Sequence, residues 1–103
     1  MIYVVTRHDA TIEWIKSIVK ERVRVVPHLD DDCILQMKQG DIVYGILPIH
    51  LIKRLLRKGI TYYHVVLPNI PFDYRGKELT LSQIKKFGGQ IWRINNIDCE
   101  MVR

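Results

Sequence analysis

A threonine, an arginine and a histidine follow one another at Thr6, Arg7 and His8, directly after an apolar run. These side chains suit the chemistry of an anion, because threonine donates a hydrogen bond, arginine binds bidentately and histidine transfers a proton near pH 7. Glu13, five residues beyond His8, is placed to orient that histidine. The same residues also fit an ordinary helix-capping turn with a solvated arginine and a plain surface glutamate. Both interpretations stay open.

A second charged cluster follows Tyr74. Two cations and a carboxylate fall within four residues there, at Arg75, Lys77 and Glu78, with Gly76 between the cations. Such a loop can clamp a phosphodiester and set the ionisation of a neighbouring group. An ordinary charged turn accounts for the local sequence equally well.

The segment from Gly45 to His50 has the pattern of a turn from a strand into a helix. Glycine permits a close approach of the backbone, and Pro48 favours the start of a helix. The backbone N–H groups that follow Leu47 are therefore candidates for holding a phosphate, and His50 points either into that site or to solvent. The G-x-x-x-x-G-K-[ST] and G-x-G-x-x-G patterns are both absent, so we expect neither a P-loop nor a dinucleotide cofactor.

Metal and covalent chemistry have little support in the sequence. His28 and Asp30 form only part of a metal-ligand set, and Cys33 and Cys99 lie 66 residues apart. No G-x-S-x-G nucleophile motif is present. His64 alternates with apolar neighbours, which indicates a buried histidine with a satisfied hydrogen bond. We expect neither a metal nor another cofactor.

Alternating strand and helix patterns must position these residues. Short β-branched runs predict strands, and apolar residues at 3.6-residue spacing predict helices. We expect Asp9 to cap the first helix, Pro48 to begin the third, and Thr80 with Gln83 to form a capping box before the last. Trp14 is expected to pack in the core. The expected strands cover residues 2–6, 23–26, 42–47, 60–67 and 90–97, and the expected helices cover 9–20, a weak segment up to 37, 48–58 and 80–87.

This order of elements predicts an α/β fold, a single small Rossmann-like domain with a mostly parallel five-stranded sheet and helices on both faces. The domain covers residues 1–103, in which 95–103 are a tail or the end of the last strand. Ligands of such sheets bind beyond the carboxyl ends of the strands. The turns at 6–8, 28–30 and 45–50 would lie at that edge, as would the charged loop. The strand order does not follow from the sequence.

The composition is that of one soluble domain. The chain has 103 residues, 48% hydrophobic and 26% charged, which argues against disordered, collagen-like and membrane-spanning classes. No basic segment precedes the first apolar run, so we expect a cytoplasmic protein with free, buried cysteines. Sixteen basic and eleven acidic residues give a net charge of +5, which favours anionic partners. The basic residues are scattered, so we expect no stable binding to DNA.

Several short segments occur in a characteristic order along the chain. They are Val5-Thr6-Arg7-His8 with Glu13-Trp14, His28-Leu29-Asp30, Gly40-Asp41, Gly45-x-Leu47-Pro48-x-His50-Leu51 and Arg75-Gly76-Lys77-Glu78-Leu79. Together they resemble a small CRISPR-associated family, the sixteenth of the Csx accessory families found beside type III CRISPR systems. The resemblance runs from Met1 to about Ile94, with local departures at residues 9–11 and at Ile46.

The resemblance implies a ring nuclease. Such proteins degrade cyclic oligoadenylate, usually cyclic tetra-adenylate, and so switch off the type III CRISPR response. It also implies a homodimer that holds the ring across its interface and works without a metal. A positive charge and helix N-termini at a sheet edge suit an anion of this kind.

Residue type and placement suggest roles in a metal-free cleavage in which a ribose 2′-OH attacks its own adjacent phosphorus. His8 would transfer the proton. Arg7 and Arg75 would bind the phosphate, while Glu78 or Glu13 would orient the histidine or an arginine. The candidate catalytic residues are therefore His8, Arg7, Arg75 and Glu78. The candidate substrate-binding residues are Thr6, Glu13, His28, Leu47, Pro48, His50, Gly76 and Lys77.

Two other functions stay open. The protein could bind cyclic oligoadenylate without cleaving it, as a sink or a sensor of the messenger. It could instead be a basic accessory protein that binds RNA or a CRISPR complex. The second alternative is disfavoured by the lack of aromatic residues among the basic ones, since proteins that bind single strands usually stack bases on such residues.

Overall fold

The computed structural model describes all 103 residues and contains one five-stranded sheet with the strand order β2-β1-β3-β4-β5. Strands β1 to β4 are parallel, and β5 runs antiparallel to β4. The prediction of a mostly parallel five-stranded sheet is therefore confirmed. The strands are β1 (Ile2–Val5), β2 (Val23–Val26), β3 (Ile42–Gly45), β4 (Thr61–Val66) and β5 (Gln90–Ile94).

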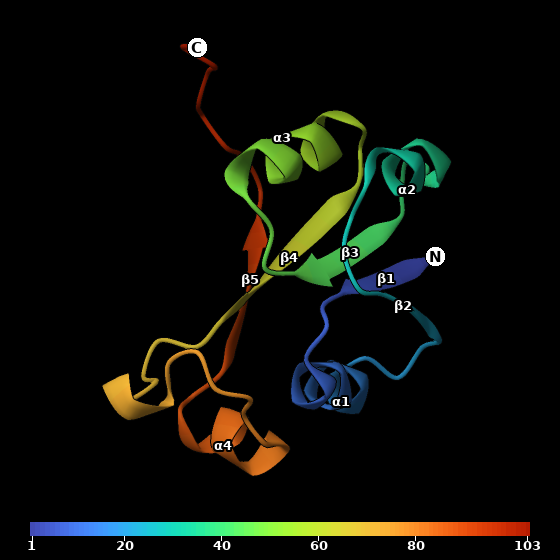
Figure 1. Cartoon of the computed structure of the whole chain (residues 1–103). Helices are drawn as coiled ribbons and strands as arrows, with labels where there is room; N and C mark the ends of the chain where they lie inside the picture. The colour runs from blue at the N-terminus through green and yellow to red at the C-terminus, as the bar shows by residue number, and fades with distance from the viewer.

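Helices cover both faces of the sheet, as predicted. Helices α1 and α4 lie on one face, and α2 and α3 lie on the other (Figure 1). None of them is both long enough and apolar enough to cross a membrane. The helices are α1 (Asp9–Ile18), α2 (Asp31–Gln36), α3 (Ile49–Arg57) and α4 (Leu81–Lys86), with a short 3-10 helix, η1 (Phe72–Tyr74), in the loop before α4.

Each face of the sheet has its own core, because successive side chains of a strand point to opposite faces. Tyr3 and Val5 belong to the core beneath α2 and α3, whereas Val4 between them belongs to the core beneath α1 and α4. Trp14 is 8% exposed and lies in the latter core, which confirms its predicted packing role. Packing on both faces fixes the sheet, and with it the turns at its carboxyl edge.

The N-cap of α1 lies one residue earlier than predicted, and α3 begins one residue later than predicted. His8, not Asp9, is the N-cap of α1, since its backbone is extended at φ −91° and ψ 112°. Pro48 is likewise the N-cap of α3 and not its first residue, because its ψ of 149° lies outside the helical region. Helix α1 also ends earlier than predicted, at Ile18, because Val19 is already extended.

Every strand except β2 ends before its predicted last residue. β3 ends at Gly45 and β4 at Val66, so the residues that follow them turn away from the sheet. β5 ends at Ile94, opposite Tyr62 near the start of β4, and the chain beyond it has no strand left to pair with. Residues 95–103 form the predicted tail, which is held to α3 by a hydrogen bond from the Lys53 ammonium to the carbonyl of residue 99.

Candidate functional site

Two pockets meet at the carboxyl edge of the sheet, as the fold prediction requires, and His8 and Ile46 line both. The strand-end pocket, about 460 Å³, lies beyond β1, β2 and β3, where the strand order reverses. The loop pocket, about 330 Å³, lies between the start of α1 and the loop before α4. Besides the two shared residues, the strand-end pocket includes Thr6, Arg7, His28, Leu47 and Pro48, and the loop pocket includes Thr11, Leu67, Ile70, Tyr74, Arg75, Gly76, Lys77, Glu78 and Leu79.

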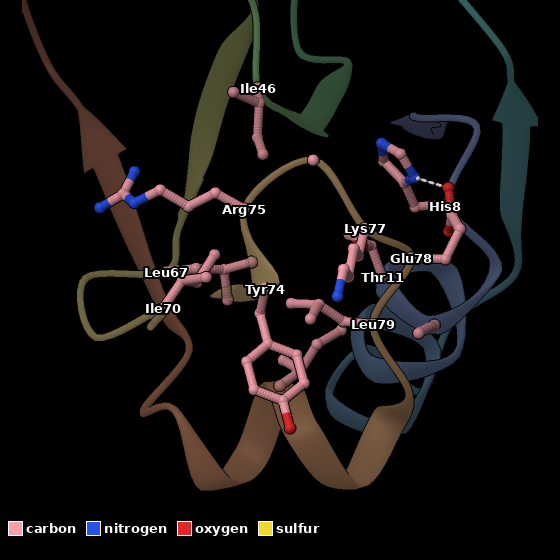
Figure 2. A pocket seen from close by; sticks show the side chains of 13 residues that line it. His8, Thr11, Ile46, Leu67, Ile70, Tyr74, Arg75, Lys77, Glu78 and Leu79 are labelled. Carbon is pink, nitrogen blue, oxygen red and sulfur yellow. Dashed lines mark hydrogen bonds and ion pairs between the residues drawn. The ribbon is translucent and has the colours of Figure 1, made fainter. Parts of the chain in front are cut away.

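The central contact of the site joins His8 and Glu78, which are 70 residues apart in the sequence. The Nδ1 atom of His8 lies 2.6 Å from Oε1 of Glu78 (Figure 2). A carboxylate in this position accepts the Nδ1 proton, and the neutral ring then carries its lone pair on Nε2. Figure 2 shows Nε2 on the side of the ring away from Glu78. The pair can therefore take a proton from a ligand at Nε2.

The ends of two helices place this pair. His8 is the N-cap of α1, and its backbone N–H donates to Oγ1 of Thr6 at 3.2 Å, which holds the turn after β1. Glu78 precedes α4, whose start is fixed by the predicted capping box between Thr80 and Gln83. Since α1 and α4 share one core, the two partners lie on the same face of the sheet, where both side chains are exposed.

The strand-end pocket carries positive and hydrogen-bonding groups and no carboxylate. The Arg7 guanidinium is exposed and forms no ion pair, and the His28 ring lies beyond the end of β2. The Thr6 hydroxyl accepts one hydrogen bond from the backbone and keeps its own proton for a ligand. Helix α3 begins at the wall of this pocket, and its first N–H groups have no helical partner. The arrangement suits an anion.

The turn between β3 and α3 is pinned by a side chain that sequence reasoning missed. The Tyr62 hydroxyl donates to the carbonyl of Gly45 at 2.9 Å and accepts the N–H of Leu47 at 3.0 Å. The Leu47 N–H is therefore not free to bind phosphate, and the predicted phosphate donors are the backbone N–H groups that follow it, at the start of α3. No sequence signal marks this contact, because a tyrosine in a strand usually indicates only packing.

Burial and hydrogen bonding also set the ionisation of this cluster. Burial raises the pKa of Tyr62 to about 12, although the N–H of Leu47 lowers it in part. His64 Nδ1 lies 2.7 Å from the same hydroxyl oxygen, and burial lowers the pKa of His64. His64 is half-buried, less than the sequence suggested, but it has the hydrogen-bond partner that was predicted.

Glycine at position 45 allows β1 and β3 to approach closely behind the site. A Cβ atom on Gly45 would lie 2.9 Å from the carbonyl oxygen of Val5, closer than packed atoms tolerate. This confirms the predicted close approach. It also explains how the ends of β1 and β3 can form the wall of one pocket.

Three predicted site residues are placed differently from their expected roles. Glu13 and His50 are exposed and line neither pocket, so the structure brings only one of the two candidate glutamates to His8. Arg75 lines the loop pocket, but Figure 2 shows its guanidinium on the side opposite His8. Arg75 and His8 therefore do not face each other across a single phosphate.

The charge around the two pockets is mostly positive. Glu78 is the one acidic residue that lines either pocket, whereas Arg7, Arg75 and Lys77 line them as cations. Elsewhere, no three histidine, cysteine or acidic side chains converge in an arrangement that could hold a metal ion. The cysteines are free, and each is half-buried rather than buried as expected.

The sequence of the chain also matches a known family. A protein family described as "Putative CRISPR-associated protein (Cas_VVA1548)" matches residues 3–97. The chain belongs to this family. The match spans nearly the whole fold and every site residue of this CRISPR-associated protein, and it confirms the CRISPR association that the resemblance implied. Neither a curated protein nor a solved structure matches the chain.

Proposed function

We propose that this CRISPR-associated protein is a ring nuclease that cleaves cyclic oligoadenylate, in particular cyclic tetra-adenylate, and so ends the type III CRISPR response in the cytoplasm. The observation that carries the proposal is the 2.6 Å contact between His8 and Glu78, at the junction of two pockets lined by cations. A proton-transfer group beside phosphate-binding groups is what a phosphodiester cleavage needs.

The reaction uses a nucleophile that belongs to the substrate. Nε2 of His8 takes the proton of a ribose 2′-OH, and the 2′-oxygen forms a bond to the adjacent phosphorus. The bond from phosphorus to the 5′-oxygen breaks, and that oxygen receives the proton from the histidine. The products are a 2′,3′-cyclic phosphate and a free 5′-OH. Glu78 holds the ring tautomer and stabilises the imidazolium that forms.

Charge that develops on the phosphate oxygens needs fixed donors nearby. Arg7 and the Thr6 hydroxyl supply them from the strand-end pocket. The first turn of α1, which begins directly after His8, adds the positive end of a helix. Arg75 lies on the far side of the loop pocket from His8, so we assign it to a neighbouring phosphate of the ring.

The proposal also includes a homodimer. A ring of four equivalent nucleotides has rotational symmetry, and a two-fold dimer presents the same surface patch from each copy. Ile46 and Ile49, at the edge of the site, are 58% and 62% exposed and give a second copy an apolar surface to cover. Sedimentation velocity with and without the ring tests this part, and a monomer under both conditions contradicts it.

The activity is tested by incubating the protein with cyclic tetra-adenylate, with and without EDTA, and separating the products by chromatography. We expect linear adenylates ending in cyclic phosphate in both reactions. His8→Ala should lower the rate at least about 100-fold, while His50→Ala, which removes a histidine outside both pockets, should leave the rate unchanged.

The outcomes separate the alternatives. Tight binding without turnover would make the protein a sink or sensor of the messenger. Salt-sensitive binding to ordinary RNA, with no response to the ring, would favour an RNA-binding accessory role. A His8→Ala variant with full turnover would remove His8 from the mechanism.

A further inference from the structure

Part of the loop pocket plays no role in the proton transfer. Beside the His8–Glu78 pair, its walls are formed by the apolar side chains of Leu67, Ile70 and Leu79 (Figure 2). These residues come from the loop after β4 and from the segment before α4. A phosphate gains nothing from such walls, so this part of the pocket fits another part of a ligand.

We infer that the loop pocket binds the adenine base of the nucleotide whose phosphate lies beside His8. The inference rests on the proposed function and adds which part of the substrate this pocket recognises. A volume of about 330 Å³ accommodates a base with part of its ribose. An apolar lining with a few polar groups is the usual environment of a bound purine, which has apolar faces and a polar edge.

Two polar side chains are placed to meet that edge. Thr11 lines the pocket, is 6% exposed and makes no side-chain hydrogen bond within the protein. Lys77 projects into the pocket and forms no ion pair with a protein carboxylate (Figure 2). A hydroxyl both donates and accepts, and an ammonium donates, so together they complement the ring nitrogens and the amino group of adenine.

The position of the pocket agrees with the shape of a nucleotide. Base and phosphates extend from different sides of a ribose, and the two pockets meet at His8. A base in the loop pocket therefore leaves its ribose and phosphate at the His8 ring, where Arg7 in the strand-end pocket reaches the same phosphate. This order places a 2′-OH near Nε2, where the proposed cleavage needs it.

The inference is tested with mononucleotides, whose binding does not depend on cleavage. Ile70→Ala removes part of the wall, and Ile70 belongs to neither core of the fold. Phe72→Ala is the matched control, because Phe72 lies in the same loop, is 86% exposed and does not line the pocket. Binding of adenosine 3′-monophosphate and uridine 3′-monophosphate is measured by NMR titration for each protein.

We expect the wild type and the Phe72→Ala variant to prefer the adenosine nucleotide by about tenfold, and Ile70→Ala to lose most of that preference. Ile70→Val, which keeps the branched side chain, should retain it and excludes general misfolding as the cause. Equal binding of both nucleotides by the wild type, or an unchanged preference in Ile70→Ala, would overturn the inference. Discrimination between nucleotides without ring cleavage would instead support the base pocket and contradict the proposed nuclease.

Discussion

Glu78 lines the loop pocket, and its one side-chain hydrogen bond joins Oε1 to Nδ1 of His8, so we expect it to act through the histidine. A partner of this kind fixes the tautomer and the orientation of the ring and stabilises its charged form. Glutamine at position 78 keeps the size of the side chain but loses its charge. The pair is therefore testable by a change of a single atom.

Glu78→Gln should lower kcat for ring cleavage about 10-fold to 100-fold with little change in KM, because the substrate still binds while the histidine loses its charged partner. Glu13→Gln is the matched control, since Glu13 is exposed on α1 and lines neither pocket. Steady-state kinetics of both variants with cyclic tetra-adenylate decide the question. Equal activity of the two variants would show that Glu78 does not act on His8 in the reaction.

The sequence predicted the edge of the sheet at which Arg7 and His8 lie, but not the contacts that they make there. Residue type and the strand-to-helix pattern were enough to select Arg7 and His8, because such turns meet at one edge of a parallel sheet. They could not decide between Glu13 and Glu78, since the choice depends on how the loop before α4 folds over α1. They also could not give the direction of the Arg75 side chain, which is a matter of rotamer and loop geometry.

At the scale of the elements, two hydrogen bonds from β4 hold the turn after β3, which forms part of the wall of both pockets. Tyr62 on β4 holds the backbone of Gly45 and Leu47, and Ile46 between them lines both pockets. A loss of this hydroxyl leaves a buried carbonyl and a backbone N–H without their partner.

Tyr62→Phe should lower the free energy of unfolding by about 1–3 kcal/mol, because two backbone groups lose a hydrogen bond. Tyr63→Phe is a control on the same strand, since the Tyr63 ring stacks on Tyr44 and its hydroxyl makes no hydrogen bond. Urea denaturation measures the free energy of unfolding of both variants. If the two variants are equally stable, the hydroxyl does not hold the turn in solution.

The same cluster predicts a stability that depends on pH. Burial lowers the pKa of His64 in the folded chain below the usual histidine value of about 6.5. As the pH falls through about 6.5, the unfolded chain takes up a proton that the folded chain does not, so the free energy of unfolding decreases. The full contribution is present above that pH and is lost as the pH falls to the lower, folded pKa.

Denaturation curves between pH 7.5 and about pH 5 measure this effect in the wild type and in His64→Asn, which keeps a polar atom toward Tyr62. The other three histidines contribute equally to both proteins. We expect the free energy of unfolding of His64→Asn to decrease less steeply as the pH falls. Identical pH profiles would show that His64 does not titrate differently on unfolding.

For the whole molecule, composition and periodicity predicted the α/β architecture, but not the order or the direction of every strand. Periodicity records which faces of a strand are buried, and this pattern is the same for either direction. The antiparallel β5 and the reversal of strand order at β1 and β3 therefore emerged only from the structure. That reversal places the strand-end pocket, so the geometry of the site depends on information that local sequence does not carry.

The net charge of +5 is spread over the whole surface, whereas the proposed site uses only a few of its cations. Binding of cyclic tetra-adenylate, with four phosphates, should weaken with salt, with a slope of log K against log salt concentration no steeper than about −3. Arg7→Ala should reduce the magnitude of this slope by about 1, because one phosphate contact is lost.

Arg57→Ala is the matched control, because Arg57 is exposed at the end of α3 far from the N-terminal turn that borders the site, and it removes the same charge. Fluorescence titrations at four or more salt concentrations, on about a tenfold range, resolve the slopes. If both variants lower the slope equally, or if linear RNA of the same length binds as tightly as the ring, attraction comes from the overall charge and not from the site. A change confined to Arg7→Ala would instead support a phosphate of the ring in the strand-end pocket, beside the His8–Glu78 pair.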